Sequence, residues 1–222
     1  MGLKQNHIKL AVRELVEKTE RTGDINFRFS GRSSAQEGIK GHQKVQKSRG
    51  EGYVAEKKVT GVFEIEGLNI EVGGRVDGYS IEPIGGRVKE DLAIQEIEQS
   101  NCDGPAIKLW VEEIKTTRMD VSQIPANIER LNWGQARVYA HLLSLEYKLP
   151  PQQNVPLTLC YYHLDEEVEY LFEENWSCDE LATYFNDLLG RYARWHTKRQ
   201  AWQKKRNSTI VDIAFPFAVY RK

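Results

Sequence analysis

Apolar residues recur along this chain at helical spacing in four stretches, and each stretch predicts a helix. The predicted helices cover residues 7–20, 34–47, 126–147 and 176–207. Two of them begin with a serine that is followed three positions later by a glutamate, Ser34 with Glu37 and Ser177 with Glu180. This spacing is typical of the capping box, in which the two side chains bond the first free backbone N–H groups of a helix.

Shorter apolar runs of strand length lie between the predicted helices. Residues 58–66 and 68–81 predict two strands that meet at Gly67 in a hairpin, and Gly73–Gly74 indicates a bulge or bend in the second. Further strands are predicted at residues 106–117, 155–164 and 168–174. The order helix, strands, strand, helix, strand predicts a mixed α/β fold around a small central sheet.

Composition limits the class of protein without deciding it. The chain has 222 residues, 40% of them hydrophobic, which is enough for one core in one domain with extensions. A net charge of −1 leaves the partner open, because nucleic-acid binding requires only local positive charge. No apolar run approaches the roughly 18–20 residues that cross a bilayer, and no signal-peptide core is present. Cys102, Cys160 and Cys178 are odd in number and far apart, which indicates reduced thiols and a cytoplasmic location.

Acidic residues interrupt two of the predicted strands. Asp77 lies in one of them, and Glu113 and Lys115 lie two positions apart in the next. Because side chains alternate along a strand, Glu113 and Lys115 share a face while Glu112 points the opposite way. Two carboxylates can ligate Mg²⁺ or Mn²⁺, and a lysine beside them can lie against an attacking water and a phosphate. Such residues also occur on ordinary exposed strands, so the spacing alone leaves both interpretations open.

Two of the predicted helices contribute further polar side chains. His42 lies about two turns into the helix that Ser34 caps, and Gln135 and Tyr139 are four residues apart on the helix at 126–147. Gln135 falls within an apolar stripe, where a polar side chain needs a partner. A glutamine that is satisfied within the core is the alternative interpretation.

Taken in chain order, these residues resemble the motifs of the PD-(D/E)XK nucleases, specifically of the RecB-like branch. The set is Gly38, His42, Asp77, Glu113, Lys115, Gln135 and Tyr139. The resemblance covers roughly residues 30–165. It implies a restriction-endonuclease-like fold, with a central mixed sheet flanked by helices, and a metal-dependent DNA nuclease that uses Mg²⁺ or Mn²⁺.

The resemblance also implies a role for each site residue. The implied metal ligands are His42, Asp77 and Glu113. Lys115 would assist the attacking water, and Gln135 and Tyr139 would hold the active-site helix and contact DNA. Because 35 residues separate Asp77 from Glu113, residues 85–105 are interpreted as an acidic surface insertion. Three scattered cysteines cannot supply the four-cysteine iron–sulfur cluster of several relatives, so no cluster is expected.

The predicted C-terminal helix is strongly basic. Between Leu188 and Arg206 there are seven lysines and arginines and no acid, and Arg191, Arg194 and Lys198 lie beside the apolar stripe. A solvated face and a track for DNA phosphates are both consistent with this pattern. The tryptophans of this helix are interpreted as core residues.

The final residues resemble the segment that precedes the helicase core in XPD/DinG-like superfamily 2 helicases; they read AFPFAVYRK. No G-x-x-x-x-G-K-[ST] phosphate-binding loop occurs within the 222 residues. The resemblance implies a nuclease core at 1–175, a basic helix at 176–207 and a linker at 208–222 towards a helicase core. Single-stranded or branched DNA is then the expected substrate. A catalytically silent DNA-binding module of a helicase and a stand-alone defence nuclease are the alternatives.

Overall fold

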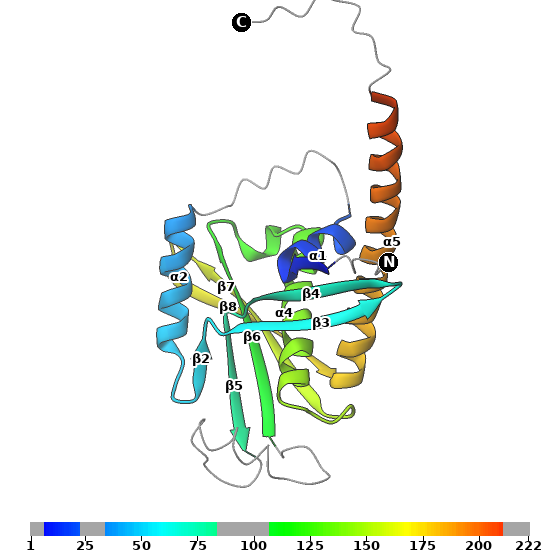
Figure 1. Cartoon of the computed structure of the whole chain (residues 1–222). Helices are drawn as coiled ribbons and strands as arrows, with labels where there is room; N and C mark the ends of the chain where they lie inside the picture. Colours follow the sequence, from blue (N-terminus) through cyan, green and yellow to red (C-terminus); the bar gives the residue numbers. More distant parts are fainter. Residues whose placement is uncertain (1–6, 23–33, 84–106, 211–222) are drawn as a thin grey trace, which may run out of the picture.

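The computed structural model describes residues 7–22, 34–83 and 107–210, which form a mixed α/β fold of two sheets flanked by four helices (Figure 1). The strands are β1 (His7–Ala11), β2 (Tyr53–Ala55), β3 (Lys58–Ile65), β4 (Leu68–Arg75), β5 (Gly78–Pro83), β6 (Ile107–Thr117), β7 (Asn154–His163) and β8 (Val168–Ser177). The helices are α1 (Val12–Glu20), α2 (Ala35–Ser48), α4 (Ala126–Glu146) and α5 (Cys178–Thr209), with a 3₁₀ turn at Val121–Gln123. The predicted insertion at 85–105, Cys102 and the segment 211–222 lie outside the described residues.

The two sheets differ in size, with three strands in one and five in the other. The smaller sheet has the order β1-β4-β3 and the larger one the order β2-β5-β6-β7-β8. The pairs β1–β4 and β6–β7 are parallel and the other pairs are antiparallel. On one face of the larger sheet Ile114 and Cys160 pack with Val45 of α2, while Val111 and Leu157 join the main core with α4 on the other. The larger sheet therefore lies between two helices. No helix within the described ranges is long and apolar enough to cross a membrane.

Local sequence signals located most of these elements. Both capping boxes are present: the Ser34 hydroxyl accepts from the Glu37 N–H at 3.3 Å, and the Ser177 hydroxyl from the Glu180 N–H at 3.2 Å. The predicted helix at 126–147, the strand at 106–117 and the closing strand pair are confirmed.

The prediction of one helix over residues 7–20 is wrong in its first part. His7–Ala11 is a strand that pairs in parallel with β4, and α1 begins only at Val12. The four-residue spacing of Ile8 and Val12 covers a single helical turn, which is too short to distinguish a helix from a strand end. Pairing with β4 satisfies the backbone of this segment, and that long-range contact decides its conformation.

The predicted single strand at 68–81 is also wrong, because the chain changes sheets at Asp77. β4 belongs to the smaller sheet and β5 to the larger one. Gly73 and Gly74 pair with β3 in regular register, so the predicted bulge is not at this position. A Cβ atom on Gly74 would lie 2.5 Å from the Tyr139 hydroxyl, so this glycine makes room for the tyrosine.

Helix α5 is longer than the body against which it packs. Its residues are buried from Leu181 to Ala193 on one face, and beyond them the helix projects from the sheets (Figure 1). Trp195 is 37% exposed and Trp202 is 59% exposed. The interpretation of these tryptophans as core residues is therefore wrong. The apolar stripe of this helix continues beyond Ala193, where no core remains among the described residues for its side chains to pack against.

Candidate metal centre

Three separate elements bring the predicted acidic and basic residues together. Asp77 lies at the change of sheets, His42 lies on α2, and Glu113 and Lys115 lie in β6. His42 Nδ1 lies 3.5 Å from Asp77 Oδ1. Asp77 Oδ2 accepts a hydrogen bond of 2.8 Å from the backbone N–H of Ile114. The aspartate is thereby held between α2 and β6, and the predicted residues meet at one place.

Glu113 and Lys115 form a buried ion pair beside Asp77. Glu113 is 2% exposed, its Oε1 accepts from the Lys115 ammonium, and its Oε2 is buried with no hydrogen-bond partner in the described part of the chain. Burial raises the pKa of Glu113 to about 7, although the charge of Lys115 opposes this. An unpaired buried carboxylate oxygen is costly, and a bound cation would remove that cost.

Asp77 and Lys115, beside Glu113, keep their charges. Burial favours the neutral form of Asp77, but the hydrogen bond from His42 and the charge of Lys115 outweigh it and lower the pKa of Asp77. Burial likewise opposes the charge of Lys115, and the carboxylates of Glu113 and Asp77 nevertheless hold its pKa above the ordinary value. The site therefore combines a charged aspartate with a charged lysine.

Glu56 is a further candidate ligand that the sequence did not predict. Ligand atoms of His42, Glu56 and Asp77 all lie within 4.8 Å of one another. Glu56 follows β2 with a φ of 59°, and its N–H donates to the Asp77 carbonyl at 3.3 Å. The Gln46 side-chain amide donates to Glu56 Oε1 at 3.1 Å and to the Asp77 carbonyl at 2.9 Å. No motif spacing marks Glu56, since only the pairing of β2 with β5 brings it here.

The donor set fits a hard divalent cation. Carboxylate oxygens and an imidazole suit Mn²⁺, and the oxygens suit Mg²⁺. The sequence prediction of ligands named Glu113, whereas the close group of three contains Glu56 with His42 and Asp77. The unpaired Oε2 of Glu113 is the further oxygen that a cation in this place could use.

Of the two predicted residues on α4, Tyr139 is the one linked to the site. Tyr139 is 7% exposed, and burial, together with the charges of Glu113 and Asp77, raises its pKa. Gln135 is half-buried, and its side-chain amide donates to the Leu131 carbonyl at 3.3 Å within the same helix. This bond is the one expected of a glutamine that is satisfied locally, so the alternative interpretation of Gln135 gains support.

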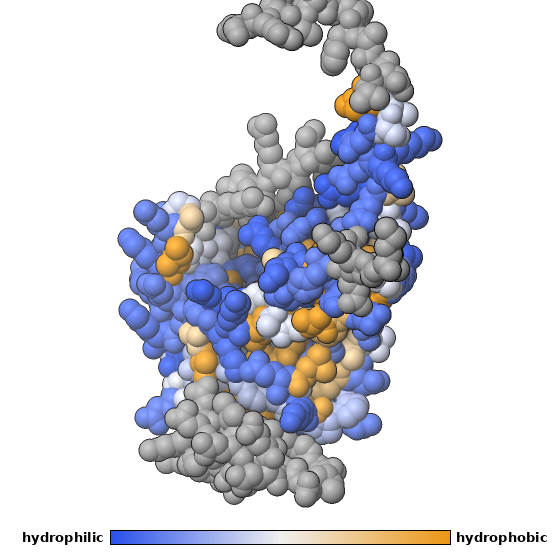
Figure 2. Space-filling model, viewed as in Figure 1, coloured by the Kyte–Doolittle hydropathy of each residue, from blue (hydrophilic) through white to orange (hydrophobic). Residues whose placement is uncertain are grey.

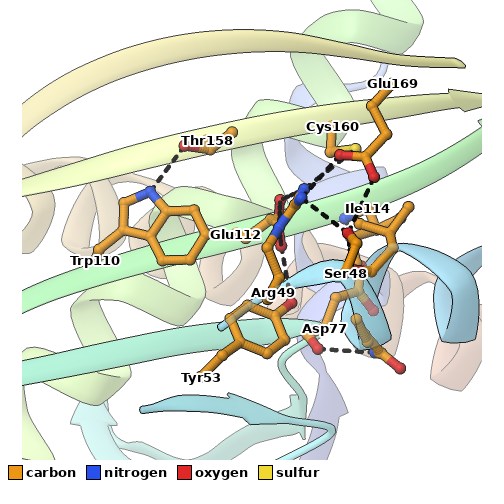
Figure 3. A network of polar contacts seen from close by, with 12 residues as sticks. Ser48, Arg49, Tyr53, Asp77, Trp110, Glu112, Ile114, Thr158, Cys160 and Glu169 are labelled. Carbon is orange, nitrogen blue, oxygen red and sulfur yellow. Dashed lines mark hydrogen bonds and ion pairs between the residues drawn. The ribbon is translucent and has the colours of Figure 1, made fainter. Parts of the chain in front are cut away.

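Glu112 lies next to Glu113 but points into a separate polar cluster on the opposite face of β6 (Figure 3). Its carboxylate is fully buried and accepts from Arg49 Nε at 3.2 Å, from Arg49 Nη2 at 2.5 Å and from the Tyr53 hydroxyl at 2.8 Å. Arg49 also pairs with Glu169 of β8 at 2.8 Å. Because Arg49 directly follows α2, this cluster fixes the helix that carries His42.

The basic residues of α5 divide into two groups. Arg191 pairs with Glu20 of α1, and Arg194 lies 3.5 Å from Glu66 at the turn between β3 and β4. Lys198 is exposed further along the helix. Two of the three predicted DNA contacts therefore hold α5 against the body, and the third is open to solvent.

No protein-family model and no curated protein matches this chain. A solved structure titled "Crystal structure of SSO0001" is similar with a TM-score of 0.42 and 16% sequence identity. The alignment covers 85% of this chain and 77% of that chain. A likeness at this level carries no argument about function.

Proposed function

We propose that this protein is a divalent-metal-dependent deoxyribonuclease of the PD-(D/E)XK class, RecB-like branch, which hydrolyses phosphodiester bonds. The observation that carries the proposal is the convergence of His42, Asp77, Glu113 and Lys115 from three elements at one buried place. Their order in the chain is the order of the family motifs, and their chemistry suits a metal ion next to a phosphate. The additional carboxylate of Glu56 strengthens the case for a cation.

His42, Asp77 and Glu113 would hold Mg²⁺ or Mn²⁺, with Glu56 as a further oxygen donor. A bound divalent ion lowers the pKa of a coordinated water and neutralises charge that builds on the phosphate. Glu113 is buried, whereas His42 and Asp77 are partly exposed, so a substrate would approach from the side of His42 and Asp77.

Lys115 supplies the second part of the chemistry. Its ammonium remains protonated because Glu113 and Asp77 lie beside it. A protonated lysine next to the scissile phosphate can orient the attacking water and donate a hydrogen bond to the phosphate oxygen as negative charge develops. Tyr139 lies close to Gly74 and within electrostatic reach of the same carboxylates, so it would help to keep β4 and α4 in place around them.

The wider setting is proposed from the resemblance. Single-stranded or branched DNA is the substrate class, and a covalently linked helicase core is the partner that would supply it. The segment on which the helicase proposal rests includes residues 211–222, outside the described ranges. A cytoplasmic location agrees with the free, buried thiols of Cys160 and Cys178.

The test is a cleavage assay with end-labelled single-stranded, duplex and forked DNA, in Mg²⁺, Mn²⁺ or EDTA. We expect metal-dependent products, greatest with single-stranded or forked DNA, and none in EDTA. Tight DNA binding without products under any metal would instead support the silent DNA-binding module and contradict the proposal. Products that form equally in EDTA would exclude a metal-dependent mechanism.

A further inference from the structure

We propose that the projecting part of α5 is a stacking platform for the bases of single-stranded nucleic acid, centred on Trp202 with Trp195 as a second position. The inference rests on the proposed function and deepens it, because it states that the substrate carries unpaired bases. It also goes beyond a basic track, since the aromatic rings are the recognising groups.

The first observation is the exposure of two large rings on one helix. Trp202 is 59% exposed and Trp195 is 37% exposed. They are seven positions apart, so they lie about two turns from each other on nearly the same face, about 10.5 Å along the axis at 1.5 Å per residue. Single exposed apolar residues are normal on protein surfaces, so the two rings indicate a ligand only together with the charges around them.

The second observation is that each ring carries an arginine. The Arg199 guanidinium carbon lies 5.1 Å from the centre of the Trp195 ring, and that of Arg206 lies 5.0 Å from the Trp202 ring. A guanidinium over the ring at this distance is attracted to one face of it, so a base would stack on the other face. Single-strand binding proteins combine aromatic platforms for bases with adjacent cations for the backbone, and both parts are present here.

The third observation is charge, which decides between nucleic acid and a protein partner. Seven basic residues and no acid lie between Leu188 and Arg206, and the projecting part of α5 is mainly hydrophilic in Figure 2. Two of the seven are paired with acids of the body. Within the described residues, the remaining five form no ion pair: Lys198, Arg199, Lys204, Lys205 and Arg206. A polyanion that presents flat apolar rings matches this surface better than an apolar protein groove does.

The fourth observation connects the platform with the metal centre. Arg13 of α1 is near enough to Lys115 for their charges to interact. At the other end of α1, Lys18 Nζ lies 4.8 Å from the Trp195 ring and Glu20 pairs with Arg191 of α5. Helix α1 therefore lies between the metal centre and the tryptophans of α5, and a DNA strand bound at both would cross α1.

The experiment measures binding apart from cleavage. A fluorescent oligothymidylate of about 20 nucleotides is titrated with protein in EDTA, alongside a blunt duplex of the same length. The variants are Trp202→Leu, Trp195→Leu and the pair, with Trp202→Phe to retain a ring. Tyr170→Leu on β8 is the matched control, because Tyr170 is an aromatic residue that is 38% exposed away from α5.

We expect each tryptophan-to-leucine change to weaken oligothymidylate binding about ten-fold, and the pair about a hundred-fold, in line with measured base stacking on aromatic side chains. Trp202→Phe should retain most of the affinity, and Tyr170→Leu all of it. Binding to the duplex should change less than about three-fold. Unchanged melting temperatures would show that the exposed substitutions leave the fold intact.

Equal oligothymidylate affinity in wild type and the double variant would overturn the inference and assign the tryptophans to a protein partner. An equal loss on duplex and single strand would overturn it as well, since stacking requires unpaired bases. The two proposals fail separately. If the wild type cleaves DNA and the tryptophan variants bind it as tightly as the wild type, only the stacking platform is contradicted. If the variants bind more weakly but the wild type does not cleave, only the nuclease proposal is contradicted.

Discussion

Replacing Arg49 by methionine tests what holds α2, and with it His42, against the larger sheet. Glu112 is fully buried, and Arg49 donates three of the hydrogen bonds to its carboxylate. In Arg49→Met the carboxylate would keep the bond from the Tyr53 hydroxyl and lose its counter-charge. The methionine occupies a similar volume, so the change removes charge rather than packing.

The expected cost follows from this geometry. Removing one partner of a buried ion pair costs about 3–5 kcal/mol, because an uncompensated charge remains in the interior. The Arg49 side chain is 18% exposed and the Tyr53 bond survives, so we expect the lower end, about 3 kcal/mol. Adding Glu112→Gln removes the stranded charge while the amide oxygen can still accept from Tyr53. The double variant should therefore be destabilised by about 2 kcal/mol less than the sum of the two single changes.

The assay is urea unfolding of wild type, both single variants and the double variant in EDTA, followed by circular dichroism. Glu169→Gln is a useful control, because it removes the outer partner of Arg49 while the buried pair remains. Additivity of the two single changes within about 0.5 kcal/mol would refute the reasoning. A loss below about 1 kcal/mol for Arg49→Met would refute it as well.

Three further predictions concern the site and the core. Lys115→Ala should lose cleavage and keep metal affinity, measured by calorimetry beside the DNA assay; lost affinity with normal cleavage at saturating metal would make Lys115 structural. Glu56→Gln should weaken Mn²⁺ binding about ten-fold or more, whereas the exposed control Glu51→Gln should not. Burial lowers the pKa of His141, stacked on Phe185, to about 4. Because the unfolded chain then binds the proton first, stability should fall by up to about 3 kcal/mol as pH drops from about 6.5 to 4. His141→Phe should remove this pH dependence, and an unchanged pH profile would contradict the assignment.

Local signals in the sequence located the helices, and long-range pairing explains the errors. The capping boxes at Ser34 and Ser177 each span four consecutive residues, so they can be predicted from the local sequence alone. The strand at His7–Ala11 exists because β4 offers an edge more than 50 residues further along the chain. The change of sheets at Asp77 likewise depends on which strands pair, and neighbouring residues do not encode that choice.

The same distinction applies to the site. His42, Asp77, Glu113 and Lys115 were predicted as one set because a family resemblance supplied the long-range information that spacing lacks. Glu56 belongs to none of these motifs, and the pairing of β2 with β5 places it near His42 and Asp77. The two faces of β6 were predictable from alternation alone, since adjacent glutamates on a strand must point to opposite sides.

The most direct test of the central claim is metal-dependent cleavage by Asp77→Asn. Single-stranded DNA with a labelled 5′ end is incubated in Mn²⁺ with excess wild type, Asp77→Asn, or the exposed control Asp179→Asn. Asn keeps the shape of the side chain and removes the charge that faces His42 and Lys115. The account predicts comparable cleavage by wild type and Asp179→Asn, and a rate lower by on the order of a thousand-fold for Asp77→Asn, which corresponds to about 4 kcal/mol of lost transition-state stabilisation. Cleavage by Asp77→Asn at the wild-type rate, with its fold intact, would contradict the account.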